Sequence, residues 1–382
     1  MRKFIILMLS MIMLLSACNS VDPSGETTAT EPTVTTTLSC TEDTMETAQE
    51  QKWGTQSLDI ASNLNDIFVP VGRTYTENKA LACDFTCTGI RFSAECEGDV
   101  SVYITSTAKA YFTLYINGER TDDRIAVAQG SSWVTVAKEL PRSVYEFELV
   151  KQSQYTMATV SLKEVRLTGI FRASQNRELF IEFYGDSVLN GSNIYLGGTT
   201  VETSDGTRAF GWLTAKALNA DCNIIGCGGL GLSVSGMNWI MDDVWNLAGS
   251  NLKTSTPVYD FGRVPNVVVI ELGDNDAARA SQTTIRKYKI QVKNFVEKIR
   301  EKYGNSLPIV WLYGYHPETY WDHTESVLDL LGGEEAKLYY CRLTESYISK
   351  DNGGDGYHPS VQTSQVMADE LTAYLKNLLG QR

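Results

Sequence analysis

The stretch LFIEFYGDS, residues 179–187, is a mostly apolar and aromatic run that ends in Gly-Asp-Ser. Apolar runs bounded by turn residues are typical of strands buried on both faces of a sheet. Three more such runs follow, at residues 222–225, 266–270 and 308–312. They alternate with stretches of helical periodicity, at about 206–219, 283–303 and 361–379. This alternation predicts an α/β domain over residues 173–382, with a parallel sheet covered by helices on both faces.

Upstream of this domain, residues 52–172 alternate apolar and polar side chains with a period of two. Such alternation is typical of half-buried strands. Asn117-Gly118 predicts a tight hairpin turn, and Gly98-Asp99 predicts a break between two strands. A series of short strands without helices predicts a β-sandwich, with a jelly-roll-like arrangement.

The N-terminus carries export signals. Residues 1–17 combine two basic residues, a short apolar run and small residues before Cys18, which predicts a signal peptide. The ending Leu-Ser-Ala-Cys resembles a bacterial lipobox, in which Cys18 is lipidated; the alternative is a plain secretory signal with a chance cysteine. Residues 18–51, rich in Ser, Thr, Glu and Pro, predict a flexible linker. We therefore expect a secreted protein, anchored to the outer face of a bacterial membrane.

The composition narrows the classes of function. The 382 residues are 43% hydrophobic and 21% charged, as in a globular protein with a large core. The formal net charge of -13 repels phosphate backbones, so we expect no nucleic-acid partner. Only three histidines occur, which argues against a His-rich zinc site. Seven cysteines remain besides Cys18, an odd number, so buried free thiols or one optional bridge are expected rather than a disulfide framework.

Polar residues follow directly after the apolar runs. In parallel sheets, ligands bind beyond the carboxyl ends of the strands, which is where these residues are expected to lie. Ser187 follows the first run, at an expected strand-to-helix turn whose N–H groups stabilise negative charge. Residues 226–231, GCGGLG, follow the second run and expose backbone N–H groups, but no acidic residue on a next strand supports a dinucleotide site. Asn275 follows the third run, where its amide either donates to an oxyanion or forms a turn.

Two further observations concern metals and a general base. Asp274 and Asp276 flank Asn275, but no carboxylates at metal-loop spacing accompany them, so neither a metal nor a cofactor is expected.

Asp355 precedes His358 by three residues, so it can bond the Nδ1–H and leave Nε2 to take a proton from a serine. The alternative is a His-Pro turn before a helix capped by Ser360.

Four sequence blocks, in this order, resemble those of SGNH (GDSL-type) hydrolases, which have a flavodoxin-like three-layer α/β/α fold. The blocks are Gly-Asp-Ser after the first run, glycine after the second, Gly-x-Asn-Asp after the third, and Asp-x-x-His-Pro before the last helix. With its β domain, the chain resembles the second carbohydrate esterase family, whose members join a jelly roll to an SGNH domain. The phrases that carry this likeness are YFTLYING (111–118), YEFELVK (145–151) and IEFYGDS (181–187).

The resemblance implies a role for each matching residue. Ser187 is the nucleophile and His358 the general base, oriented by Asp355 or, as in some members of the family, by a backbone carbonyl. The oxyanion hole is formed by the N–H groups of Ser187 and Gly229 and by the side chain of Asn275. Gly226, Gly228 and Gly231 compete with Gly229 for this position.

The resemblance also implies an activity. We expect a serine esterase that removes O-acetyl groups from plant cell-wall polysaccharide, acetylated xylan or glucomannan, through an acyl-enzyme. Four aromatic residues near the strand ends are candidates for stacking on sugar rings: Trp239, Trp311, Tyr315 and Trp321. Two alternatives stay open: an esterase for O-acetylated peptidoglycan, a lipid or a thioester, and a glycan-binding surface lipoprotein without turnover. The sequence predicts no oligomeric state.

Overall fold

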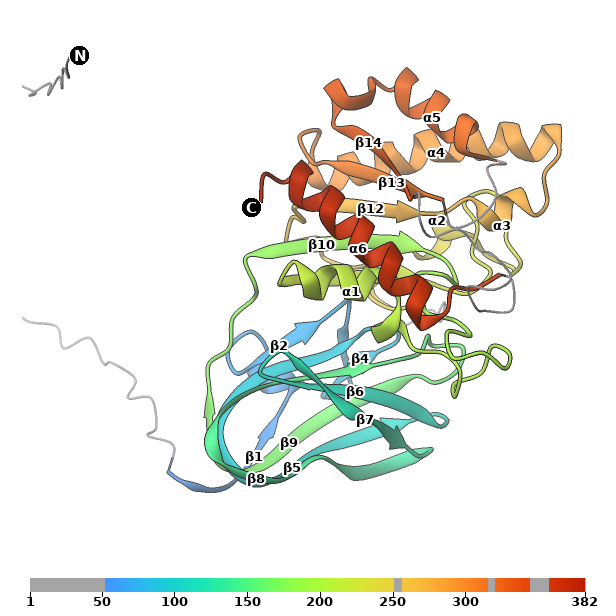
Figure 1. Cartoon of the computed structure of the whole chain (residues 1–382). Coiled ribbons are helices and arrows are strands. Elements are labelled where there is room, and N and C mark those ends of the chain that lie inside the picture. Colours follow the sequence, from blue (N-terminus) through green and yellow to red (C-terminus); the bar gives the residue numbers. More distant parts are fainter. Residues whose placement is uncertain (1–51, 251–255, 315–319, 344–356, 382) are drawn as a thin grey trace, which may run out of the picture. The chain divides into compact units, whose positions relative to one another are not determined.

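The computed structural model describes residues 52–250, 256–314, 320–343 and 357–381 (Figure 1). The predicted signal peptide, Cys18 and the linker lie outside the described residues, as do Tyr315 and Asp355. Within the described ranges, no helix has both the length and the apolar character needed to cross a membrane.

The N-terminal part of the described chain forms one antiparallel sheet, as the period-two pattern predicts. Its strands are β1 (Gly54–Asp59), β2 (Phe68–Val71), β3 (Tyr75–Glu77), β4 (Ala80–Cys83), β5 (Gly89–Ser106), β6 (Ala110–Ile116), β7 (Glu119–Val127), β8 (Gly130–Lys151) and β9 (Val160–Arg172). The order is β3-β4-β9-β5-β8-β6-β7, while β1 pairs with β9 and β2 with β5. A short 3₁₀ helix, η1 (Ala61–Asn63), follows β1.

Two turn predictions have different outcomes. The Asn117-Gly118 hairpin between β6 and β7 is confirmed, because both residues have positive φ, 52° and 84°. The break predicted at Gly98-Asp99 is wrong. Gly98, with φ of 74°, lies inside the 18-residue strand β5, where the pairing with β8 shifts register. A bulge therefore bends the strand without ending it.

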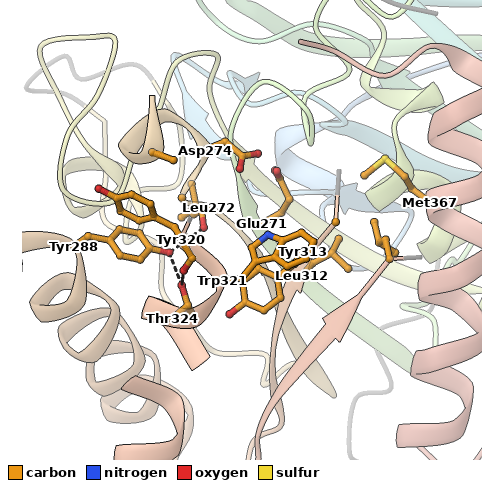
Figure 2. Close-up of a pocket in the computed structure, with 14 residues that line it drawn as sticks. Glu271, Leu272, Asp274, Tyr288, Leu312, Tyr313, Tyr320, Trp321, Thr324 and Met367 are labelled. Carbon is orange, nitrogen blue, oxygen red and sulfur yellow. Dashed lines mark hydrogen bonds between the residues drawn. The ribbon is translucent and has the colours of Figure 1, made fainter. Parts of the chain in front are cut away.

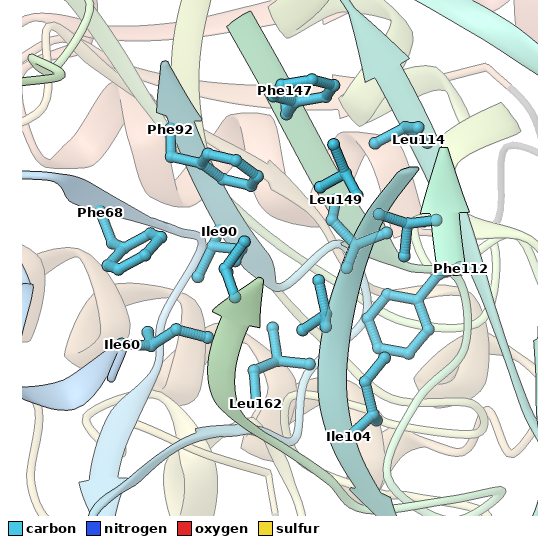
Figure 3. Packing of buried hydrophobic residues seen from close by; sticks show 14 of the residues in the cluster. Ile60, Phe68, Ile90, Phe92, Ile104, Phe112, Leu114, Phe147, Leu149 and Leu162 are labelled. Carbon is cyan, nitrogen blue, oxygen red and sulfur yellow. The ribbon is translucent and has the colours of Figure 1, made fainter. Parts of the chain in front are cut away.

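The inward side chains of these strands form a continuous apolar core. Figure 3 shows Phe92 and Phe147 stacked across β5 and β8, with Phe68 beside Phe92. The ring centroids of Phe92 and Phe147 are 5.0 Å apart. Alternation along each strand places such residues on one face, and their burial removes apolar area from water. The six described cysteines are buried and unpaired, as the odd count suggested: Cys83, Cys87, Cys96, Cys222, Cys227 and Cys341.

The C-terminal part forms the predicted parallel sheet. Its strands are β10 (Leu179–Gly185), β11 (Ala220–Gly226), β12 (Val267–Glu271), β13 (Ile309–Tyr313) and β14 (Leu338–Arg342). The order is β11-β10-β12-β13-β14, and every pair is parallel. The first four strands correspond to the four apolar runs, whereas β14 is an additional edge strand. Its sequence, LYYCR, includes exposed Tyr340 and lacks a continuous apolar run.

Helices cover both faces of this sheet. They are η2 (Gly206–Arg208), α1 (Phe210–Ala217), α2 (Met241–Val244), α3 (Asp274–Ala277), α4 (Gln282–Tyr303), α5 (Trp321–Leu330), η4 (Gly333–Ala336) and α6 (Val361–Leu378). In Figure 1, α1 and α6 cross one face, where Phe210 and Met367 pack with Phe183. Helix α4 packs on the other face, where Val292 joins Tyr184. The side chains of adjacent sheet residues thus point to opposite layers.

A buried arginine connects the two sheets. Arg73, in the turn between β2 and β3, forms an ion pair with Glu182 of β10 at 2.7 Å and donates to the Tyr184 hydroxyl at 2.8 Å. Its guanidinium also lies 4.2 Å from the centre of the Tyr259 ring. Both partners of the ion pair are at most 1% exposed. The described residues accordingly belong to a single compact unit.

Candidate active site

Ser187 lies just beyond the end of β10, in a series of tight turns. The buried carboxylate of Asp186 accepts from the Val188 N–H at 3.0 Å, and the Ser192 N–H donates to the Ser187 carbonyl at 3.0 Å. The helix expected after Ser187 is not formed, since residues 187–195 are turns. Gly191 explains this: its φ is +65°, and a Cβ there would lie 2.3 Å from the Asp205 carbonyl oxygen. No helix N-terminus therefore faces Ser187 from this segment.

One cleft brings together the described residues of the predicted machinery. Ser187, Gly229, Asn275 and His358 all line a cavity of about 590 Å³. They come from four segments, which follow β10, β11 and β12 and precede α6. Other lining residues are Gln154, Asp186, Ser192, Thr199, Gly228, Asp274, Ala277, Ala278 and Tyr357. The carboxyl ends of parallel strands meet at one edge, which accounts for this convergence.

The glycine loop after β11 distinguishes among the candidate oxyanion donors. The Gly228 N–H donates to Gln154 Oε1 at 2.7 Å and is therefore occupied. Gly226 belongs to β11. Gly231 packs against the backbone of Val234, whose carbonyl oxygen would lie only 1.7 Å from a Cβ at position 231. Within the described parts of the chain, the Gly229 N–H makes no hydrogen bond, and Gly229 lines the cleft. This geometry favours Gly229, as the resemblance implied.

Asp276 holds the rest of this loop, a role that the sequence analysis did not assign. The Asp276 side chain is fully buried and accepts from the backbone N–H groups of Leu232, Ser233 and Val234, at 2.8, 2.7 and 2.9 Å. Three backbone donors on one carboxylate fix the path of the chain beyond the glycines. The sequence does contain a sign of this role, because Asp276 is the final residue of the Gly-x-Asn-Asp block.

The Asn275 amide is already engaged. Its Nδ2 donates to Asp186 Oδ2 at 2.7 Å and to the Leu230 carbonyl at 3.0 Å. Because an amide nitrogen carries two hydrogens, both are occupied in this arrangement. An oxyanion bound by Asn275 must therefore share or replace one of these acceptors.

Three carboxylates form a cluster at the cleft: Asp186 and Asp274 line it, and Glu271 lies next to them. One oxygen from each lies within 4.8 Å of the others. Burial, and then repulsion from Asp186 and Asp274, raise the pKa of Glu271 well above its ordinary value. Burial, and then repulsion from Asp276, raise the pKa of Asp274 to about 7. Carboxylates this close do not all ionise at neutral pH, so shared protons account for their approach.

The predicted sugar-stacking residues do not line this cleft where the structure describes them. Trp311 is fully buried and its indole N–H donates to the Leu272 carbonyl at 3.1 Å, so its ring is not presented to this cleft. Trp239 is 8% exposed, with its ring 5.4 Å from that of Tyr155 in an edge-to-face arrangement. Trp321 lies at a different cavity of about 20 Å³, shown in Figure 2, which has room for about one water.

Among the residues that the structure describes, the tyrosine or tryptophan that lines the cleft is Tyr357. It is 71% exposed and precedes His358. The sequence analysis missed it as a binding residue, although its position beside the expected general base was visible in the last block. An exposed ring at a polar cleft is suited to stacking on a sugar.

The β domain supplies one wall of the cleft. Thr199 lies in residues 193–205, a segment held by Arg124 of β7. Arg124 Nη1 donates to the Glu202 carbonyl at 2.7 Å, and its guanidinium lies 5.0 Å from the centre of the Tyr195 ring. Gln154, between β8 and β9, lines the cleft directly.

The chain is similar to carbohydrate esterases in sequence and in fold. A scan against models of protein families finds none that matches the chain. The chain is 29% identical over 309 residues to the cellulase/esterase CelE of Acetivibrio thermocellus, covering 74% of this chain and 36% of that protein. It is 26% identical over 225 residues to an acetylxylan esterase/glucomannan deacetylase of Cellvibrio japonicus, covering 54% and 62%. The chain thus spans less than two thirds of each relative.

A solved structure shows the same fold. It is that of a family two carbohydrate esterase from Clostridium thermocellum in complex with cellohexaose, with a TM-score of 0.74 and 24% identity. The likeness covers 82% of this chain and 99% of that one. The resemblance to the second carbohydrate esterase family, predicted from the sequence, is confirmed by these comparisons.

Proposed function

We propose that the chain is a serine esterase that removes O-acetyl groups from plant cell-wall polysaccharide, such as acetylated xylan or glucomannan. The observation that carries this proposal is the single cleft lined by Ser187, Gly229, Asn275 and His358. Support for the substrate class comes from the relatives, one named an acetylxylan esterase/glucomannan deacetylase, and from the similar structure with bound cellohexaose.

The proposed reaction begins with proton transfer. His358 takes the proton of the Ser187 hydroxyl as Oγ attacks the acetyl carbonyl. The tetrahedral oxyanion receives hydrogen bonds from the N–H groups of Ser187 and Gly229 and from the Asn275 amide, which gives up an existing acceptor. The C–O bond to the sugar then breaks, and His358 gives the proton to the departing sugar oxygen, which leaves as a hydroxyl.

Deacylation regenerates the serine. His358 takes a proton from water, whose oxygen attacks the acetyl-Ser187 carbonyl through the same oxyanion hole. Collapse of the second tetrahedral species releases acetic acid, and the proton held by His358 returns to Ser187. Asp355, or a backbone carbonyl, orients the imidazole in this proposal.

The proposed location follows from the N-terminal sequence. A signal peptide over residues 1–17, a lipid on Cys18 and a linker over 18–51 would hold the esterase outside the cell. A polysaccharide is too large to enter a cell, so this location suits the proposed substrate. The β domain, proposed to be jelly-roll-like, would then face the polymer beside the cleft.

Acetate release tests the proposal. We expect the protein to liberate acetate from acetylated xylan or glucomannan, and Ser187→Ala or His358→Ala to lower kcat by about 10⁴. Acetylated peptidoglycan, a lipid ester and a thioester serve as comparison substrates. Activity of either variant within tenfold of the parent would overturn the assigned roles, and a preference for a comparison substrate would overturn the polysaccharide.

A further inference from the structure

Gln154 reaches the cleft from the β domain, in the segment between β8 and β9. The segment is anchored on both sides. On one side, Gln152 Nε2 donates to Thr113 Oγ1 of β6 at 2.8 Å. On the other, the Tyr155 ring packs edge-to-face on Trp239, in the loop that follows the glycines. The position of Gln154 is therefore set before any substrate binds.

The Gln154 side chain contacts two segments of the hydrolase domain. Gln154 is 7% exposed, and its Oε1 accepts from the Gly228 N–H at 2.7 Å. The same oxygen lies 2.8 Å from the Asn190 amide, in the turns after Ser187. If the Asn190 amide is turned by 180°, it donates to the Gly226 carbonyl and accepts from the Gly228 N–H, both at 3.2 Å, and its oxygen then faces Gln154 at 2.8 Å, so the Gln154 amide turns with it and donates to Asn190. In either orientation, the two amides hold residues 226–228.

This contact bears on the proposed oxyanion donor. The Gly229 N–H belongs to the peptide unit that joins Gly228 to Gly229. On the far side, the Gly229 carbonyl accepts from the Gly236 N–H and from Ser235 Oγ, both at 2.9 Å. Consecutive glycines are conformationally permissive, and Gly229 has a φ of +79°. The Gly229 N–H therefore keeps a stable direction only if the chain is held by hydrogen bonds on both sides of the Gly228-Gly229 pair.

We propose that Gln154 is a positioning residue, through which the β domain fixes the Gly229 N–H in the oxyanion hole. The inference rests on the proposed hydrolytic function and deepens it. Preorganised donors stabilise charge because they need no rearrangement during the reaction, and displacement of about 1 Å costs about 10²-fold in rate. The β domain thus takes part in catalysis as well as forming a wall of the cleft.

Gln154→Met tests the proposal, because methionine has a similar length and no amide. With p-nitrophenyl acetate, we expect kcat to fall about 10- to 100-fold while KM changes less than threefold. Tyr155→Phe is the matched control in the same segment, because it keeps the ring that packs on Trp239. We expect its activity to stay within twofold of the parent. Should Gln154→Met fail to fold, Gln154→Asn keeps the amide but withdraws it by one methylene and should show the same loss of kcat.

A second readout separates this proposal from the choice of substrate. A fluorophosphonate phosphonylates a reactive serine and places its P=O oxygen in the oxyanion hole, whatever ester the enzyme prefers. We expect Ser187 of the folded Gln154 variant to react about 10- to 100-fold more slowly than in the parent. Equal rates of labelling and equal kcat would overturn the role of Gln154. If the Gln154 variant is labelled more slowly but the parent releases no acetate from glycans, the role of Gln154 is supported and the proposed substrate is overturned.

Discussion

Asp186 joins the turn at Ser187, the proposed nucleophile, to the third sequence block. One carboxylate oxygen accepts from the Val188 N–H, beside Ser187, and the other accepts from Asn275 Nδ2. The residue is 1% exposed, so the strength of both bonds depends on its charge. Asp186 therefore orients the Asn275 amide, and it also competes with an oxyanion for one of the two hydrogens.

The neighbouring Asp274 predicts a pH dependence of stability. Its pKa is raised to about 7 in the folded protein, from an ordinary value of 3.8. Between about pH 4 and 7 the folded state therefore binds more protons than the unfolded chain, so the free energy of unfolding falls as pH rises. Asp274→Asn removes this titration. We expect the variant's melting temperature, relative to the parent, to increase as pH rises from 4 to 7.5.

Thermal unfolding at several pH values checks this expectation. Asp260→Asn is the control, because Asp260 is an exposed carboxylate away from the cluster. Parallel curves for the parent and Asp274→Asn across the whole range would contradict the raised pKa. A difference that appears only above neutral pH would assign the titration to Glu271, whose pKa is also raised.

The segment 193–205 is the element through which the β domain shapes the cleft. Arg124 donates to the carbonyl oxygens of Glu202 and Ser204 in this segment. It also donates to Gln152 Oε1 at 2.8 Å, whereas the ion pair of Lys109 with Glu202, at 3.2 Å, is exposed at both side chains. Thr199, at the cleft, is thus held by contacts that reach back to the β strands.

Arg124→Ala should make the segment 193–205 less firmly held, without altering the side chains of Ser187 or His358. We expect KM for an acetylated polysaccharide to rise about fivefold or more, while kcat/KM for p-nitrophenyl acetate stays within twofold. Lys109→Ala is the control, because its ion pair is exposed and pairs of this kind contribute little. An unchanged KM for the polymer would show that the segment does not contact the substrate.

Secondary structure was predictable where a local pattern decides it. The four apolar runs became β10 to β13, and the three helical stretches contain α1, α4 and α6. Helix α5, the other short helices and edge strand β14 were missed, and the helix expected after Ser187 is wrong. Edge strand β14 exposes Tyr340 to solvent, and the chain after Ser187 turns because Gly191 packs against the Asp205 carbonyl.

At the scale of the whole molecule, contacts between the two sheets were the least predictable. The buried ion pair between Arg73 and Glu182 joins residues more than a hundred positions apart, and Gln154 contacts Gly228 across 74 positions. The sequence blocks predicted Ser187, Asn275 and His358, which line one cleft, because each follows or precedes a recognisable element. The anchor provided by Gln154 has no such block, and the position of Trp311 near a strand end did not reveal that its side chain is fully buried.

The central claim of this account is that Ser187 becomes acetylated during turnover. The most direct measurement is mass spectrometry of the protein after rapid acid quenching of a reaction with p-nitrophenyl acetate. We expect one acetyl group on the peptide that contains Ser187, none on Ser187→Ala, and slower labelling of His358→Ala. Turnover at the parental rate by Ser187→Ala, or an acetyl group found on another residue in the parent, would contradict the account.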